Sequence, residues 1–291
     1  MFQGSMVALV TPMAEDGRVD FEALEKLVEW HIAEGTDAIV AVGTTGESAT
    51  LEVAEHLQVV EHCIRAAAGR VPVIAGTGSN NTAHAIEMTR RAQALGANAA
   101  LLVVPYYNKP TQEGLYRHFS AIADAVSLPV ILYNVPSRTV TDLLPETVGR
   151  LATVRNIVGI KEATGKLERV GSIRKLCGDD FLLISGDDAT AAEFMLAGGC
   201  GVISVTANVA PRLMHEMCVA ACSGNRPLAE ECNRRLALLH RDLFVETSPI
   251  PVKWALAQMG RIPAGIRLPL TPLSPACFDT VRAALKAAGI G

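Results

Sequence analysis

One lysine of this 291-residue sequence stands where a lysine is costly. Lys161 ends the apolar run 157–160, which predicts a buried strand, and Glu162 follows it directly. A lysine that leaves water loses the hydration of its ammonium, so its pKa falls and more free amine remains at neutral pH. Such an amine attacks a carbonyl carbon and forms a Schiff base. The alternative is a structural lysine whose side chain extends from the strand end to solvent.

Tyrosine is rare in this chain, yet it recurs at predicted strand ends. Three of the four tyrosines lie there: Tyr106 and Tyr107 follow the run 99–104, and Tyr133 lies in the run 129–134. A phenol both donates and accepts a proton, which suits the carbinolamine step of Schiff-base chemistry. The alternatives are an aromatic at the sheet edge for Tyr133, and packing or interface residues for the other two.

Two segments have the residue types that bind carboxylates. The sequence GTTGE (43–47) offers the hydroxyls of Thr44 and Thr45 and closely spaced backbone N–H groups at the expected start of a helix, where an anion is favoured. A phosphate would fit as well, but the lysine of a P-loop is missing. Arg138 follows a proline turn and is suited to bind a second carboxylate with two hydrogen bonds, or else it is a solvated loop arginine.

Two acidic or sulfur pairs resemble metal ligands only weakly. Asp187 and Asp188 follow the run 181–185, and we interpret them as a helix N-cap because the chain from 189 onward has a helical pattern. Cys218 and Cys222 have i,i+4 spacing, but no second His or Cys pair accompanies them. We therefore expect no metal, and Schiff-base chemistry on Lys161 would need no organic cofactor because the lysine supplies the electron sink.

The elements that position these residues alternate in a regular way. Short apolar runs, continuous rather than alternating, are typical of a parallel sheet covered on both faces. Eight of them, each followed by a longer segment, favour an α/β fold of the closed (β/α)₈ (TIM) barrel type, with its chemistry at the C-terminal strand ends. They lie at 6–11, 38–43, 71–76, 99–104, 129–134, 157–161, 181–185 and 201–206.

Amphipathic segments between and after these runs predict helices. The first spans 21–34, with Asp20 as its N-cap and Gly35 beyond its end. Others are expected at 54–68, 82–95, 111–126 and 167–177, and near 211–223, 227–244, 250–259 and 275–288. We predict a barrel over residues 1–225 and a C-terminal helical domain over 226–291.

The composition narrows the classes of function. Hydrophobic residues make up 49% of the chain, which is ample for a core, and the net charge of −4 favours neither nucleic acid nor an anionic membrane as a partner. No apolar run reaches the ~18 residues of a membrane span, and the N-terminus does not resemble a signal peptide. Seven scattered cysteines are typical of reduced thiols, so we expect a cytoplasmic protein.

Three motifs in this order, GTTGE, YNVPSRT (133–139) and GIKEAT (159–164), give the whole chain a specific resemblance. It resembles the dihydrodipicolinate synthase branch of the N-acetylneuraminate lyase family, which are class I, pyruvate-dependent aldolases. The resemblance implies a barrel with a C-terminal helical domain. It also implies a lyase that condenses pyruvate with L-aspartate 4-semialdehyde and cyclises the product, on the route to diaminopimelate and lysine, in a homotetramer built as a dimer of dimers.

The same resemblance assigns roles in catalysis. Lys161 would form the Schiff base with pyruvate, and Tyr133 would transfer protons during imine formation and cyclisation. Thr44 and Tyr107 would complete a proton relay with Tyr133. Tyr107 would reach across a tight dimer interface into the neighbouring subunit's site.

Substrate binding is implied in the same way. Thr45 and the backbone of Ile203 would hold the pyruvate carboxylate, and Arg138 would hold the carboxylate of the semialdehyde. Neuraminate lyases lack that arginine, since their aldehyde partner is a neutral sugar.

Three alternatives remain open. The chain could be a pyruvate aldolase acting on a 2-keto-3-deoxy sugar acid. It could be a pyridoxal-phosphate enzyme, although the segment after the eighth run is not a Gly-rich phosphate loop. It could also be a non-catalytic barrel that binds a ligand.

Some relatives are inhibited by lysine bound at the dimer interface, and part of that site is present here. Ser48, Ala49, His56, Asn80 and Tyr106 match it, whereas Val53 and His84 stand where strongly inhibited enzymes carry His and Glu.

We therefore predict weak or absent inhibition by lysine. The missing glutamate removes a charge-assisted hydrogen bond to an ammonium, worth roughly 1.5–3 kcal/mol. Initial rates measured across a lysine titration test this prediction, and half-inhibition at micromolar lysine would contradict it.

Overall fold

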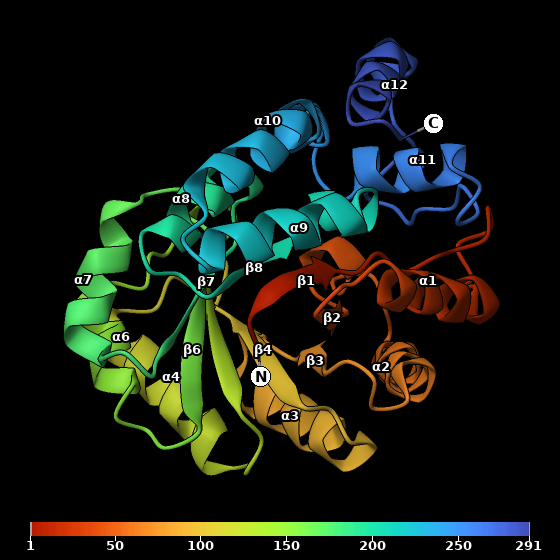
Figure 1. The fold of residues 1–291 in the computed structure, drawn as a ribbon. Coiled ribbons are helices and arrows are strands. Elements are labelled where there is room, and N and C mark those ends of the chain that lie inside the picture. Colours follow the sequence, from red (N-terminus) through yellow and green to blue (C-terminus); the bar gives the residue numbers. More distant parts are fainter. Residues whose placement is uncertain (1, 291) are drawn as a thin grey trace.

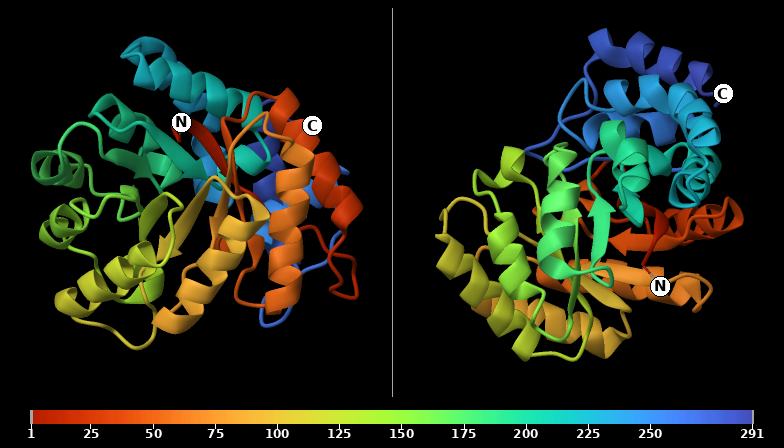
Figure 2. Two further views of the ribbon diagram at one scale, coloured as in Figure 1. Left: turned by 90° about the horizontal axis from the view of Figure 1, so that it is seen from below. Right: turned by 60° about the vertical axis from the view of Figure 1, so that its left-hand side comes forward.

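The eight strands of the protein close into one parallel barrel in the computed structural model, which describes residues 2–290. Each strand pairs with the next along the chain, and the last pairs with the first. The (β/α)₈ prediction is confirmed (Figure 2). The strands are β1 (Gly4–Ala8), β2 (Ala38–Ala41), β3 (Val73–Gly76), β4 (Ala99–Val103), β5 (Val130–Asn134), β6 (Ile157–Glu162), β7 (Leu182–Ser185) and β8 (Gly201–Ser204).

The first strand lies earlier than the predicted 6–11. The strand ends at Ala8, and the polar groups of residues 10 and 11 bond to other segments instead of to a neighbouring strand. The Val10 N–H donates to the Asn208 side chain (3.1 Å), and the Thr11 hydroxyl donates to the Gly46 carbonyl (2.7 Å). Residues 9–11 therefore form part of the barrel rim rather than of the strand.

Helices surround the barrel (Figure 1). As predicted, the Asp20 carboxylate caps the first helix by accepting the Ala23 N–H at 2.9 Å, and Gly35 beyond its end has φ +89°. These helices are α1 (Phe21–Ala33), α2 (Val53–Ala67), α3 (Thr82–Leu95), α4 (Gln112–Asp124), α5 (Pro136–Thr139), α6 (Pro145–Leu151), α7 (Glu168–Cys177), α8 (Ala191–Leu196) and α9 (Pro211–Cys222). The sequence analysis missed α5 and α6, because four and seven residues are too few to show a helical repeat.

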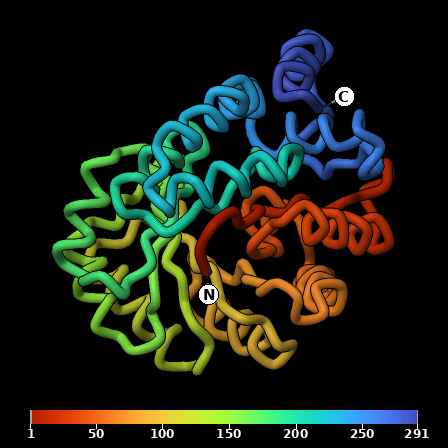
Figure 3. Tube along the Cα trace, viewed as in Figure 1, coloured from red at the N-terminus to blue at the C-terminus, as the bar shows by residue number. Residues whose placement is uncertain are grey.

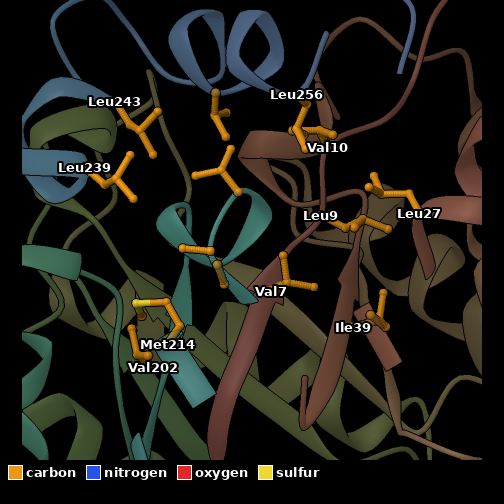
Figure 4. Packing of buried hydrophobic residues seen from close by; sticks show 14 of the residues in the cluster. Val7, Leu9, Val10, Leu27, Ile39, Val202, Met214, Leu239, Leu243 and Leu256 are labelled. Atoms are coloured by element: carbon orange, nitrogen blue, oxygen red, sulfur yellow. The ribbon is translucent and has the colours of Figure 1, made fainter. Parts of the chain in front are cut away.

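Three further helices follow the barrel: α10 (Arg226–Asp242), α11 (Ile250–Gln258) and α12 (Phe278–Ala287). They lie together with α9 on one side of the molecule, drawn in blue in Figure 3. Their apolar residues share one hydrophobic core with β1, as Figure 4 shows for Val7, Leu239 and Leu256. The division at residues 225 and 226 stays a prediction. The shared core is what brings this late segment to the barrel.

The pairing of β5 with β6 sets two residue pairs side by side. Tyr133 is opposite Lys161, and Asn134 is opposite Glu162. Successive strand residues point to opposite faces, so Glu162 should face away from the barrel centre when Lys161 faces toward it. It does, because its carboxylate accepts from the guanidinium of Arg169 on α7 at 2.9 Å.

A buried polar network completes the partners of Glu162. Arg169 also donates to Asp142 (3.0 Å) and to the Leu143 carbonyl (2.6 Å), and the Asn134 amide donates to Asp142 (2.8 Å) and Glu162 (3.2 Å). Buried charges are tolerated when they are paired and hydrogen-bonded in this way. The network therefore fixes β5 and β6 directly behind Tyr133 and Lys161.

None of the helices within residues 2–290 has the length and apolar character needed to cross a bilayer.

Candidate active site

A cavity of about 250 Å³ opens at the C-terminal ends of the strands. It contains six of the predicted site residues, from the ends of four different strands: Thr44, Thr45, Tyr133, Arg138, Lys161 and Ile203. The structure therefore brings them together on one rim, where barrels carry their chemistry. Ala8, Val40, Leu101, Ala163, Gly186, Asp187, Val205, Phe244 and Ser248 also line it.

Lys161 points into this cavity and is almost fully withdrawn from water, with 6% of its surface exposed. Burial lowers its pKa to about 8; the charge of Asp188 opposes this shift and that of Arg138 adds to it. Its Nζ lies 4.3 Å from the centroid of the Tyr133 ring. The free amine is therefore far more populated near neutral pH than in a solvated lysine, and the free amine is the form that attacks a carbonyl.

Gly186 leaves the space that the lysine chain occupies. A Cβ atom at this position would lie 3.0 Å from both Cγ and Cε of Lys161, and 2.7 Å from the Cβ of Ala163. Any larger residue would push the lysine aside. The sequence analysis missed this glycine, although its place directly after a predicted strand was a signal.

The phenol of Tyr133 is buried beside the amine. Burial raises its pKa, while the charge of Arg138 and the side chain of Thr44 oppose the rise. The hydroxyl therefore keeps its proton at neutral pH. A phenol that keeps its proton is chemically able to donate it to a departing oxygen.

The GTTGE segment is wrongly predicted as the start of a helix. Residues Thr44–Gly46 form a single 3₁₀ turn, and α2 begins only at Val53. The turn ends because Glu47 has a left-handed backbone (φ +58°). The N–H groups of Gly46 and Glu47 bond to Gly43 O (3.0 Å) and Thr44 O (3.1 Å). The cavity is therefore lined by the two threonines rather than by a helix N-terminus.

Arg138 lies on the short helix α5 at the mouth of the cavity. One of its guanidinium N–H groups donates to the Ser248 carbonyl at 3.2 Å. Ser248 and Phe244 come from the segment between α10 and α11 and both line the cavity. No local pattern in the sequence marked either residue, because only the packing of the C-terminal helices brings them to the barrel.

Tyr107 is the one predicted catalytic residue that the structure does not place in the cavity. Its side chain is 91% exposed and its backbone is left-handed, with φ +74°. Within this chain it does not line the cavity that contains Tyr133. Its predicted role in a neighbouring subunit stays a prediction.

A second cavity of about 420 Å³ adjoins the first and shares Thr44, Tyr133 and Arg138 with it. Most of the predicted regulatory residues line it: Ser48, Ala49, Val53, His56, His84 and Tyr106. Asn80 is held nearby, since its amide donates to the Tyr106 carbonyl (3.2 Å). Burial lowers the pKa of His56 to about 4, and its Nε2 bonds to the Gly76 carbonyl at 2.9 Å. A neutral imidazole adds no positive charge to this cavity.

Asp187 acts as the N-cap that the sequence predicts. Its carboxylate accepts the Thr190 N–H (3.1 Å) and hydroxyl (2.6 Å). Asp188 binds the backbone N–H groups of Val205 and Thr206 at 2.9 and 3.0 Å. Over residues 2–290 no group of three or more His, Cys, Asp or Glu side chains is arranged to hold a metal ion.

The fold and the cavity together define a class: a TIM barrel with a buried, amine-bearing lysine on its sixth strand beside a protonated phenol. Comparison with known proteins identifies the family within this class. The profile of the dihydrodipicolinate synthetase family matches residues 1–288, and the chain belongs to this family.

The similarity extends over whole relatives. The chain is 66% identical over 290 residues to 4-hydroxy-tetrahydrodipicolinate synthase of Methylococcus capsulatus, covering 100% of both. A crystal structure of the chloride-inhibited dihydrodipicolinate synthase from Acinetobacter baumannii complexed with pyruvate is 57% identical, with a TM-score of 0.99 and 100% of both chains covered. Dihydrodipicolinate synthase from Aquifex aeolicus is 47% identical, with a TM-score of 0.97 and 99% of each chain covered.

The lowered pKa of Lys161 predicts how its amine reacts with pH. Carbamylation by cyanate, which needs the free amine, should rise with a midpoint near pH 8 in the folded protein, because burial disfavours the ammonium. Peptide mass spectrometry measures the rate at Lys161. The same residue in chain unfolded with guanidinium chloride is the control and should follow the ordinary value of 10.5. Equal midpoints in the two states would contradict the shift.

Proposed function

We propose that this chain condenses pyruvate with L-aspartate 4-semialdehyde and cyclises the product, the reaction of 4-hydroxy-tetrahydrodipicolinate synthase. The observation that carries the proposal is the buried amine of Lys161, which faces the ring of Tyr133 inside a cavity at the rim of the barrel. Membership of the dihydrodipicolinate synthetase family supports the same reaction.

The first half of the reaction activates pyruvate. The free amine of Lys161 attacks the keto carbon and gives a carbinolamine. The Tyr133 phenol donates a proton to the hydroxyl, which leaves as water, and an imine forms. The positive imine nitrogen then serves as an electron sink, so the methyl carbon loses a proton and becomes an enamine.

The second half forms two bonds. The enamine carbon attacks the aldehyde carbon of the semialdehyde, whose oxygen takes up a proton and becomes the 4-hydroxyl. The amino group of the semialdehyde then attacks the imine carbon and displaces Lys161, which closes the six-membered ring. One water is released overall and the lysine returns to its starting state. The chemistry needs no organic cofactor, because Lys161 supplies the electron sink.

The cavity has separate groups for the two carboxylates. Thr45 and the backbone of Ile203 hold the carboxylate of pyruvate; in support of this assignment, both line the cavity that contains Lys161. Arg138 lies at the mouth and binds the carboxylate of the incoming semialdehyde through its planar fork.

The proposal includes self-association and a cytoplasmic location. A homotetramer, as a dimer of dimers, would bring the Tyr107 of one subunit to the Thr44 and Tyr133 of another and complete the relay. In its favour, Tyr107 is 91% exposed and Tyr106 is 42% exposed, which is costly for large aromatic surfaces in water. All seven cysteines are free thiols, as expected in a reducing compartment.

Trapping with pyruvate tests the proposed function most directly. Sodium borohydride added with pyruvate should attach one reduced pyruvate to the peptide that contains Lys161, because the hydride reduces the imine. Mass spectrometry of the digested protein measures the adduct, and borohydride without pyruvate is the control. Folded protein that forms no adduct would contradict the mechanism.

Replacing Arg138 tests the choice of aldehyde partner. In Arg138→Ala, kcat/KM for the semialdehyde should fall about 10- to 150-fold, the loss expected for a charged hydrogen bond of roughly 1.5–3 kcal/mol. Pyruvate trapping at Lys161 should persist, and Arg138→Lys should recover only part of the rate because it lacks the fork. If instead a 2-keto-3-deoxy sugar acid is cleaved faster than the semialdehyde is consumed by the native chain, the sugar-acid aldolase is the better assignment.

A further inference from the structure

A buried ion pair joins the threonine-bearing turn to the C-terminal helices. Glu47 follows the turn Thr44–Gly46, and Lys253 lies on α11, more than two hundred residues later in the chain. Each is only 3% exposed, and the Nζ of Lys253 donates to Oε1 of Glu47. Neither residue lines the cavity that holds Lys161. The two charges therefore neutralise each other and do not face the cavity.

The second carboxylate oxygen of Glu47 is also occupied. It accepts the backbone N–H of Arg267 at 3.1 Å. The guanidinium of Arg267 donates to the Thr50 carbonyl (2.8 Å) and, with two bonds of 2.6 Å, to the carboxylate of Glu55 on α2. The C-terminal segment thus holds the chain after the turn at three successive points.

The backbone of the turn needs such contacts. Glu47 adopts a left-handed conformation (φ +58°), which is strained for a residue with a side chain and persists only where surrounding contacts impose it. The opposite side of the turn has one anchor, the bond from the Thr11 hydroxyl to the Gly46 carbonyl at 2.7 Å. The bend at Glu47 is what ends the 3₁₀ turn and leaves Thr44 and Thr45 lining the cavity.

A carboxylate is the side chain that fits this position. It accepts on both oxygens, from the Lys253 ammonium on one side and from the Arg267 N–H on the other. A glutamine has the same shape but only one accepting atom, so its amide group would face a donor at one of the two partners. Removing Lys253 would leave a buried carboxylate without its counter-ion, which is strongly unfavourable.

We propose that Glu47 and Lys253 are positioning residues: the C-terminal helix α11, through this pair, sets the conformation of the Thr44–Thr45 turn and with it the subsite for the pyruvate carboxylate. The inference rests on the proposed function, since it assigns the subsite to pyruvate. It explains why a late segment of the chain carries a buried lysine that the reaction does not use.

Two variants and a matched control test the pair. Glu47→Gln keeps the side-chain volume, and Lys253→Met keeps the chain length but removes the charge. Lys286→Met makes the same change at an exposed site on α12. Steady-state kinetics give KM for each substrate and kcat. Hydrogen exchange of the peptide that contains residues 43–50 reports on the turn without any activity.

The pair variants should raise KM for pyruvate about tenfold or more, while KM for the semialdehyde changes less than about threefold. Exchange in residues 43–50 should be faster by at least a factor of about ten, and Lys286→Met should match the native chain in both. A pair that only stabilised the fold would lower Tm and leave both KM values and local exchange unchanged, which would overturn the proposal. Failure of both pair variants to fold, with Lys286→Met folded, would also overturn it.

The two levels of inference fail separately. If native protein forms no pyruvate adduct at Lys161, the proposed function fails, whatever the variants show. If native protein forms the adduct and the pair variants keep native KM and exchange, the proposed function stands and the positioning role does not.

Discussion

The withdrawal of the Lys161 ammonium from water is the constraint on which the rest of the site depends. Burial lowers its pKa to about 8, and the negative charge of Asp188 limits how far it falls. A fully solvated lysine would hold almost no free amine at neutral pH, and one without a nearby negative charge would be costlier to bury. The barrel meets both needs by ending β6 inside a cavity and by leaving only a hydrogen atom at position 186, where a side chain would displace the lysine.

The register between β5 and β6 sets which residues lie beside Lys161 and beside Glu162. Because Tyr133 pairs with Lys161, the residues that follow them, Asn134 and Glu162, form a pair on the opposite face. There the guanidinium of Arg169 joins Glu162 and Asp142 in one hydrogen-bonded network. The face toward the barrel centre carries Tyr133 and Lys161, and the face toward the helices is held by hydrogen bonds. The C-terminal helices supply a second set of constraints, through Ser248 to Arg138 and through Lys253 to Glu47.

Much of the fold could be predicted because its signals are local. Eight continuous apolar runs, each followed by a helical segment, indicate a barrel whatever their distant contacts are. The errors lie where distant contacts compete with local preference. The first strand ends early because the Val10 N–H bonds to the Asn208 side chain and the Thr11 hydroxyl bonds to the Gly46 carbonyl. The GTTGE segment is a single turn rather than a helix start, since Glu47 is held in a left-handed conformation.

By itself the sequence determined the order of the elements, the rim on which the reactive residues lie, and the chemistry that Lys161, Tyr133 and Arg138 are able to perform. These follow from residue type and from periodicity, which are properties of short segments. Only the tertiary structure decided that Gly186 leaves room for the lysine, that Tyr107 is exposed and does not line the cavity of its own chain, and that Phe244 and Ser248 do line that cavity. Such facts depend on distances between segments far apart in the chain, and those distances are set by packing rather than by local pattern.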